Sequence, residues 1–221
     1  MSWIKKIFQS DEGPPDKLVK PPFPPLVRDV FGSDESLFEW QGEVRLQSWT
    51  GFANPEDLTS DGWAPDNPRP EGILALSMEP ADVEAASEPA EDQARAFQHL
   101  LDNQQPTLDA VLQAFFNSYG AWRDSYFNAQ ISSDGGKTYQ PASADPDLCP
   151  PENMPEISVP AGLMRIIRPN TVHILESSKD GFAEVGFQFA CKWDEEHGLG
   201  VLTHKGKVLQ IGDASASFEH Q

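Results

Sequence analysis

The amino-acid sequence predicts an α+β fold in which an antiparallel sheet carries a helical hairpin packed on one face. Two patterns carry this prediction. Residues 38–49 and 185–193 alternate apolar side chains with small or polar ones, at the period of two expected of a half-buried strand. Residues 107–122 instead repeat their apolar side chains at the spacing of one helix face.

The first predicted strand covers residues 38–49, and its apolar side chains occupy even positions: Phe38, Trp40, Val44 and Leu46. Glutamate and arginine side chains occupy odd positions between them, which indicates one buried and one solvated face. A turn-rich stretch follows over 51–70, and a second, short apolar strand is predicted over 73–78. These two strands are expected to pair as a meander.

Two helices are predicted next. The first covers 87–104, with Ser87 as its cap and Pro89 in its first turn. The second begins at Pro106 or Thr107 and carries the strongest helical pattern of the chain: Leu108, Val111, Leu112, Phe115, Phe116, Tyr119 and Trp122. The short link between them predicts a helical hairpin.

The remaining strands are predicted in the C-terminal third, after a long loop over 128–156 and a brief helical turn after Pro160. These predicted strands cover residues 171–176, 185–193, 199–203 and 208–211. Asp180-Gly181 is typical of a tight turn, and residues 204–207 are typical of a hairpin loop. The consecutive turns predict antiparallel neighbours throughout.

Charge excludes several classes of protein. The 221 residues contain 16 Lys and Arg against 35 Asp and Glu, a formal net charge of −19. Nucleic-acid binders need a basic surface, and anionic membranes would repel this chain, so neither partner is expected. Residues 29–160 account for the whole net acidity. This segment predicts either a solvated acidic face or recognition of a basic partner.

The chain is expected to divide at residue 34. Residues 1–34 form an N-terminal segment that contains a proline-rich arm, 14–25, with six prolines in twelve positions. Residues 35–221 form a single α+β domain. Cys149 and Cys191 lack the spacing of a zinc site, and one disulfide between them is the alternative to two reduced thiols. Reduced cysteines without a signal peptide favour a cytoplasmic protein.

One dense polar cluster stands out, between two predicted strands: Trp193, Asp194, Glu195, Glu196 and His197. Its three carboxylates and one imidazole have the chemistry to ligate a metal or to act as acid and base. Neighbouring side chains of a strand point to opposite faces, so they converge only if the chain turns tightly. Three alternatives follow. Asp194 and Glu195 cap and brace the turn while His197 makes one buried hydrogen bond, or the cluster contacts a ligand or partner, or it is a metal or catalytic site.

The string from Trp193 to Val201 also resembles the C-terminal signature of an uncharacterised bacterial domain family of unknown function. The resemblance extends more loosely over residues 35–218, including Val172–Leu175, Gly181–Phe189 and the helical segment before them. It implies a bacterial cytoplasmic protein. It implies no activity, cofactor or catalytic residue, so no catalytic, metal or cofactor residue is assigned.

Two functions from different classes follow. The first is a non-enzymatic interaction protein, an immunity-like or accessory factor that binds a basic partner through the acidic segment. The second is a metal-assisted hydrolase or small-ligand-binding protein that uses the turn 194–197. A carboxylate-rich mimic of DNA is a third, minor alternative. Whether the chain is an enzyme stays open, with the balance against it.

The cluster also permits a structural prediction. Trp193 shares the odd-numbered face of its strand with Phe187 and Phe189, so it is expected to be mostly buried against the apolar stripe of helix 107–122. If the strand period continues, His197 lies on the same inward face. Its replacement by alanine would then destabilise the fold, because a buried hydrogen-bond partner would be left unsatisfied.

Overall fold

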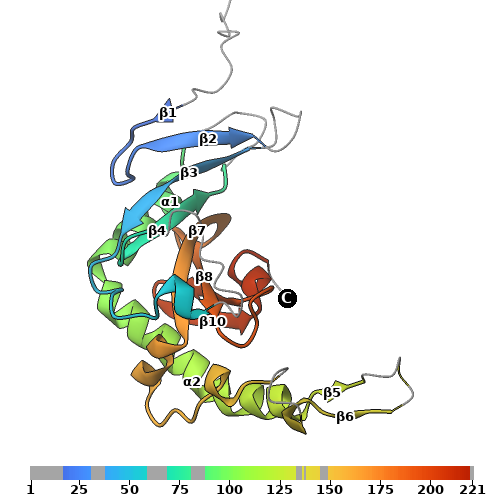
Figure 1. Ribbon diagram of the computed structural model, residues 1–221. Helices are drawn as coiled ribbons and strands as arrows, with labels where there is room; N and C mark the ends of the chain where they lie inside the picture. The colour runs from blue at the N-terminus through green and yellow to red at the C-terminus, as the bar shows by residue number, and fades with distance from the viewer. Residues whose placement is uncertain are drawn as a thin grey trace, which may run out of the picture.

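The computed structural model describes residues 17–30, 38–58, 69–80, 88–132, 136, 138–144 and 149–219. Eight of the strands form one sheet in the order β1-β2-β3-β4-β7-β8-β9-β10, and the helices pack against it (Figure 1). The α+β class is confirmed. The predicted cap Ser87 and residues 1–16 and 31–34 of the N-terminal segment lie outside the described residues.

The C-terminal strands are hairpins, as the turn signals predict. β7 (Ile167–Lys179) and β8 (Phe182–Cys191) join through Asp180 and Gly181, whose φ angles of 52° and 72° suit the tight turn. β9 (Leu199–His204) and β10 (Lys207–Gly212) join through Lys205 and Gly206, which also have positive φ. All three neighbouring pairs from β7 to β10 are antiparallel.

The N-terminal half of the sheet contains the exception to the antiparallel prediction. β3 (Phe38–Arg45) and β4 (Ile73–Met78) pair antiparallel, but β4 pairs with β7 in parallel. The prediction was wrong here because β4 and β7 are joined by a crossover that includes both helices. A long crossover returns the chain to the same end of the sheet, and this produces parallel neighbours.

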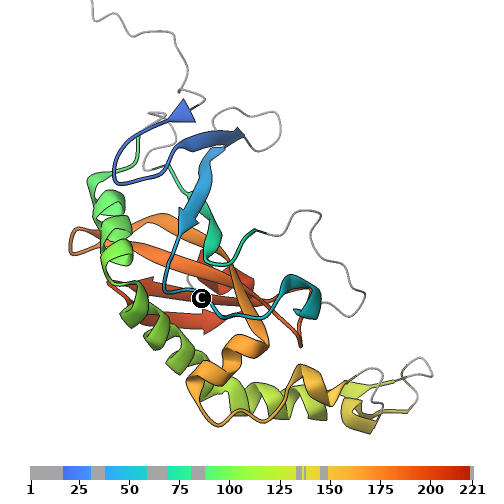
Figure 2. The same cartoon turned by 60° about the vertical axis from the view of Figure 1, so that its left-hand side comes forward.

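The two helices do not form a hairpin, which corrects the second detail of the prediction. α1 (Glu91–Asp102) and α2 (Gln104–Asn128) are separated by Asn103 alone, which ends one helix and begins the other. Helical hydrogen bonding continues nearly across this residue, since its N–H bonds His99 and its carbonyl accepts from Thr107. One residue cannot reverse a helix, so α2 runs onward from α1 with a bend (Figures 1 and 2).

Both helices nevertheless cover one face of the sheet, as predicted. α1 packs on β7 and β8, and α2 packs on β10 and the short helix η4 (Pro160–Arg165). The apolar stripe of α2 is buried at Leu108, Val111, Leu112, Phe115 and Tyr119. Trp49 stacks on Phe187 with ring centroids 4.7 Å apart. Burial of such large aromatic side chains is the main stabilising contribution of this core.

The other face of the sheet is covered in part by the C-terminal segment, around the short helix η5 (Ala214–Ser217) (Figure 1). Two strand glycines allow its close approach. A Cβ atom on Gly186 would lie 1.6 Å from the carbonyl oxygen of Ser217, and one on Gly200 would lie 2.3 Å from that of Asp213. The glycines on this face of β8 and β9 therefore leave room for a second layer.

Residues 17–30 add two strands at the sheet edge, β1 (Lys17–Leu18) and β2 (Leu26–Val30). Phe23, within the proline-rich arm, is buried and stacks on Phe97 of α1 at 5.0 Å. This segment thus packs on the same core as the rest of the sheet, and the division of the chain at residue 34 stays a prediction.

The remaining elements are short. A two-stranded ribbon extends from the end of α2 and consists of β5 (Gln130–Ile131) and β6 (Gln140–Pro141) (Figure 2). Three further 3₁₀ turns are Pro55–Leu58, Ala142–Ala144 and Pro151–Asn153. Cys149 and Cys191 are buried and free, so they form no disulfide. Within the described part of the chain, no helix is long and apolar enough to cross a membrane.

Candidate functional site: an aromatic hollow beside the 193–197 turn

The polar cluster after β8 forms a tight turn that Asp194 braces. Its Oδ1 accepts a hydrogen bond from the backbone N–H of His197 at 3.0 Å, and its carbonyl accepts one from Gly198 at 2.9 Å. Gly198 has φ of 63°, which glycine adopts without strain. Of the three alternatives for this cluster, the structure shows the bracing of the turn by Asp194.

His197 lies outside the core, which corrects the prediction that it faces inward. Its side chain is 60% exposed, and its Nδ1 lies 3.0 Å from Asp194 Oδ1. The strand period ends at Cys191, and the turn then carries His197 away from the inward face. The hydrogen bond and negative charge of Asp194, followed by the charge of Glu196, raise the pKa of His197.

Trp193 packs where it was predicted, but it is less buried than expected. Its ring meets Tyr119 edge-on at 5.9 Å and Trp122 at 6.3 Å, so it lies against the apolar stripe of α2. The side chain is half-buried. Its accessible part faces an open hollow on the surface.

This aromatic hollow is formed where four segments meet. α2 supplies one wall, the turn after β8 supplies another, and the start of β9 and the end of β10 close it. The hollow measures about 380 Å³ and is lined by Trp122, Ser125, Tyr126, Trp193, Asp194, Gly198, Leu199, Gly212 and Asp213. It therefore contains two of the predicted site residues, Trp193 and Asp194. Glu195, Glu196 and His197 are exposed on the same turn.

Asp213 brings a second carboxylate to the hollow from a different segment. Its Oδ1 accepts hydrogen bonds from Ser215, from the backbone N–H at 3.0 Å and from the hydroxyl at 2.6 Å. These bonds lower the pKa of Asp213, so its carboxylate is ionised at neutral pH. In Asp194 and Asp213 alike, the recorded hydrogen bonds use Oδ1.

The arrangement suits a cation. Half-buried aromatic rings attract positive charge through their faces, and the side-chain oxygens of Asp194 and Asp213 beside them add hydrogen-bond acceptors. A metal centre is less well matched, since no group of three or more His, Cys, Asp or Glu side chains in the described ranges is placed to hold an ion. In the predicted cluster Asp194 contacts His197, and the two glutamates are exposed.

Sequence reasoning missed Trp122, Tyr126 and Asp213 as site residues. Trp122 was assigned to the apolar stripe of the helix, although it and Tyr126 lie four residues apart, on one side of α2. Asp213 carries a local signal, because an Asp two residues before a Ser is typical of a capped turn. The packing of Trp193 on the stripe that includes Trp122 was predicted, but nothing local indicated that Tyr126 and Asp213 join them around a hollow.

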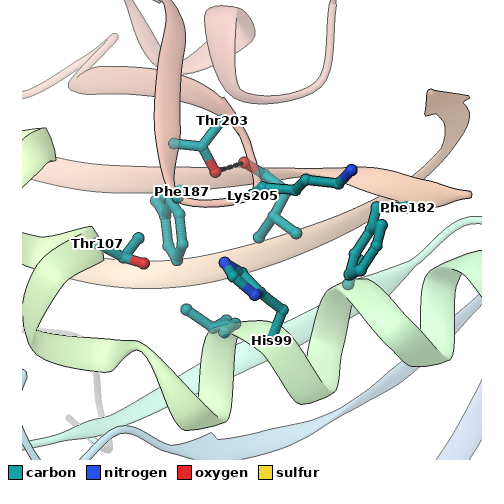
Figure 3. A pocket seen from close by; sticks show the side chains of 10 residues that line it. His99, Thr107, Phe182, Phe187, Thr203 and Lys205 are labelled. Atoms are coloured by element: carbon teal, nitrogen blue, oxygen red, sulfur yellow. Dashed lines mark hydrogen bonds between the residues drawn. The ribbon is translucent and has the colours of Figure 1, made fainter. Parts of the chain in front are cut away.

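A second pocket lies between the helices and the sheet (Figure 3). Figure 3 shows His99 from α1 and Thr107 from α2 facing β8 and the β9–β10 turn, where Lys205 Nζ lies 4.4 Å from the ring centroid of Phe182. Thr203 donates to the carbonyl of Val185 at 2.8 Å. The pocket measures about 10 Å³, which is about the room that one water molecule occupies. It is therefore part of the packing between α1 and the sheet.

Comparison with known proteins identifies a family. Residues 70–218 match the family model described as a domain of unknown function, DUF6985. The match includes both helices, β4, β7 to β10 and every residue of the aromatic hollow. No curated protein and no solved structure matches the chain significantly.

Proposed function

We propose that this chain, which belongs to the DUF6985 family of domains of unknown function, is a non-enzymatic interaction protein that binds a protein partner with a basic surface. The observation that carries the proposal is the aromatic hollow with the carboxyl groups of Asp194 and Asp213 at its wall. Glu195 and Glu196 extend the same negative surface into solvent. Aromatic side chains that remain accessible beside charges are typical anchors of protein interfaces.

The charge of the whole chain supports the same partner. A net charge of −19 attracts a basic protein over a distance, accelerates its association and makes the association salt-sensitive. The immunity-like or accessory role in a bacterial cytoplasm belongs to this proposal. In such a role the acidic surface would cover a basic functional surface of the partner.

The alternative is a metal-assisted hydrolase or small-ligand-binding protein built on the turn 194–197. It is less well supported, because Asp194 Oδ1 is used by the backbone of its own turn and by His197. The two glutamates of the turn are solvated on the surface. Metal analysis of the purified protein, with thermal shifts in divalent ions, tests this alternative directly.

The experiment for the proposal is affinity capture from the source cell with immobilised protein at low and high salt. We expect a basic protein to be retained at low salt and released at high salt. Replacement of Glu195 and Glu196 by glutamine should weaken its retention. The matched control replaces Asp102 and Asp109 by asparagine, which removes the same charge from exposed helix positions.

Asp109 lies 13 residues before Trp122 on α2, about 20 Å along the helix, so the control leaves the hollow untouched. Equal retention by both double variants would show that only overall charge matters. Retention of no basic protein at low salt would overturn the proposal.

A further inference from the structure

We infer that the aromatic hollow receives one arginine side chain of the partner, so that arginine insertion is the specific anchor of the interaction. This inference rests on the proposed function, because it names the group that the site recognises. The hollow lies at the small end of the roughly 300–1,000 Å³ range of ligand pockets. At about 380 Å³ it suits a single inserted side chain.

The aromatic walls are held in place before any partner arrives. Trp122 and Tyr126 project from one side of α2, and Trp193 faces them from the turn. Tyr119 contacts the Trp193 ring edge-on, and its hydroxyl donates to the carbonyl of Pro155 at 2.8 Å. Such fixed rings lose little conformational freedom on binding, which favours affinity.

The carboxylates are fixed as well. Asp194 and Asp213 each use Oδ1 to brace the turn in which they lie, so their positions are set by the backbone. The recorded bonds leave Oδ2 of each residue to accept from a bound cation. The two acids come from different segments, after β8 and after β10, which are joined by a hydrogen bond from the N–H of Ala214 to the carbonyl of His197 at 3.1 Å.

A guanidinium fits this combination better than an ammonium. It is planar, stacks on aromatic faces and presents several N–H groups in a fixed fork, so it can contact rings and carboxylates together. A lysine ammonium is a compact, strongly hydrated charge that gains less from stacking. The apolar part of the arginine side chain would be covered by the three rings.

The test is a titration of ¹⁵N-labelled full-length protein with N-acetyl-arginine amide, followed through the tryptophan indole N–H resonances. We expect the Trp122 and Trp193 resonances to shift, while that of fully buried Trp49 stays in place as an internal control. N-acetyl-citrulline amide has nearly the same shape without the charge. Its affinity should be lower by a factor of about ten or more. N-acetyl-lysine amide should bind between the two.

Variants separate the anchor from general charge. Asp213→Asn keeps a good capping residue and removes the negative charge, so it should lose most of the arginine response without loss of folding. Trp122→Leu should do the same by removing a wall, and Asp109→Asn should leave the response unchanged. Equal responses to arginine and citrulline, or unshifted Trp122 and Trp193 resonances, would overturn the inference.

The outcomes also distinguish this inference from the proposed function. A partner that is retained by Asp213→Asn and Trp122→Leu, but lost on replacement of Glu195 and Glu196, supports the interaction function and refutes the arginine anchor. An arginine response in a protein that captures no basic partner refutes the interaction function and supports the anchor.

Discussion

The imidazole of His197 lies in solvent and has one recorded partner, Asp194. Its replacement by alanine should therefore leave the stability of the fold nearly unchanged. Exposed substitutions of this kind change the free energy of unfolding only slightly, so the melting temperature should move by under about 2 °C. Thermal unfolding followed by circular dichroism measures this. A fall of several degrees would mean that the ring supports the turn more than its exposure indicates.

The contact between Asp194 and His197 leads to a prediction for the pKa of His197. Asp194→Asn should lower the pKa of His197 toward its ordinary value, because Asp194 provides the two largest causes of the raised pKa. Asp213→Asn is the matched control and should lower it much less, since Asp213 is the weakest of the named causes. NMR titration of the imidazole resonances measures both. Equal falls in the two variants would contradict the assignment of the pair.

His173 predicts how stability depends on pH. Burial against Phe218 and the sheet lowers its pKa, and its Nε2 is buried without a hydrogen-bond partner among the described residues. A lowered folded-state pKa means that the unfolded chain binds the proton more tightly. Stability should therefore be full above the unfolded pKa of about 6.5 and fall as pH drops from there toward the lowered value.

The measurement for His173 is chemical unfolding between pH 7.5 and 5. His173→Gln, which retains hydrogen-bonding groups without titrating there, should flatten the decline. His197→Ala is the comparison, because the pKa of His197 is raised and its effect on stability has the opposite sign. The stabilising contribution of His197 is present below its unfolded pKa and is lost as pH rises through its folded pKa. An unchanged pH slope in the His173 variant would contradict the prediction.

At the scale of elements, two glycines with opposite surroundings make a matched pair. Gly186 lies on β8 beneath the C-terminal segment, where a Cβ would meet the carbonyl oxygen of Ser217. Gly186→Ala must displace backbone, so we expect a loss of about 1–3 kcal/mol in the free energy of unfolding. Gly120 lies inside α2, where a Cβ would meet no neighbouring segment of the described chain within 4 Å.

Gly120→Ala should therefore stabilise the protein by about 0.5–1 kcal/mol, because alanine is the better helix residue. Urea unfolding of both variants gives the two changes on one scale. Unchanged stability in Gly186→Ala would show that the packing of the C-terminal segment on β8 is not as described, and destabilisation by Gly120→Ala would contradict the open surroundings of Gly120.

The bend between α1 and α2 also belongs to this scale. The sequence of residues 103–105 could be interpreted as a loop between two helices. The apolar stripes predicted on either side are both buried in the structure. The stripes are compatible with a hairpin or with two consecutive helices on one sheet face. Only the sheet decides, since β7 and β8 cover α1 and β10 covers α2.

At the scale of the whole molecule, the family match begins inside the sheet. It starts at residue 70, yet β3 precedes this point and pairs with β4 along six residues. Trp40 and Trp49 are fully buried in the shared core. Loss of one such side chain costs about 3–5 kcal/mol, and whole domains are stable by only about 5–15 kcal/mol.

A chain that starts at residue 70 should therefore fail to unfold cooperatively, whereas the full chain should melt in one cooperative transition. Circular dichroism and the dispersion of NMR spectra measure this. A cooperative transition of the shorter chain at an unchanged temperature would show that the matched region is an independent folding unit.

What the sequence determined by itself was local. The strands of the C-terminal half, the strand 73–78 and the apolar stripe of α2 follow from periodicity, and the turns at 180–181 and 205–206 follow from the conformations of Asp, Lys and Gly. These features depend on residues a few positions apart. The bracing of the turn by Asp194 could be predicted for the same reason, because its partner His197 is three residues away.

Only the tertiary structure decided the parallel pairing of β4 with β7, the course of the helices and the composition of the hollow. Trp122, Trp193 and Asp213 are separated by up to 91 positions and meet because α2, the turn after β8 and the end of β10 pack at one corner of the molecule. Periodicity shows which face of an element is buried, but it carries no information on which other element covers that face. Contacts between distant segments arise from packing, so the site could be recognised only after the elements were placed.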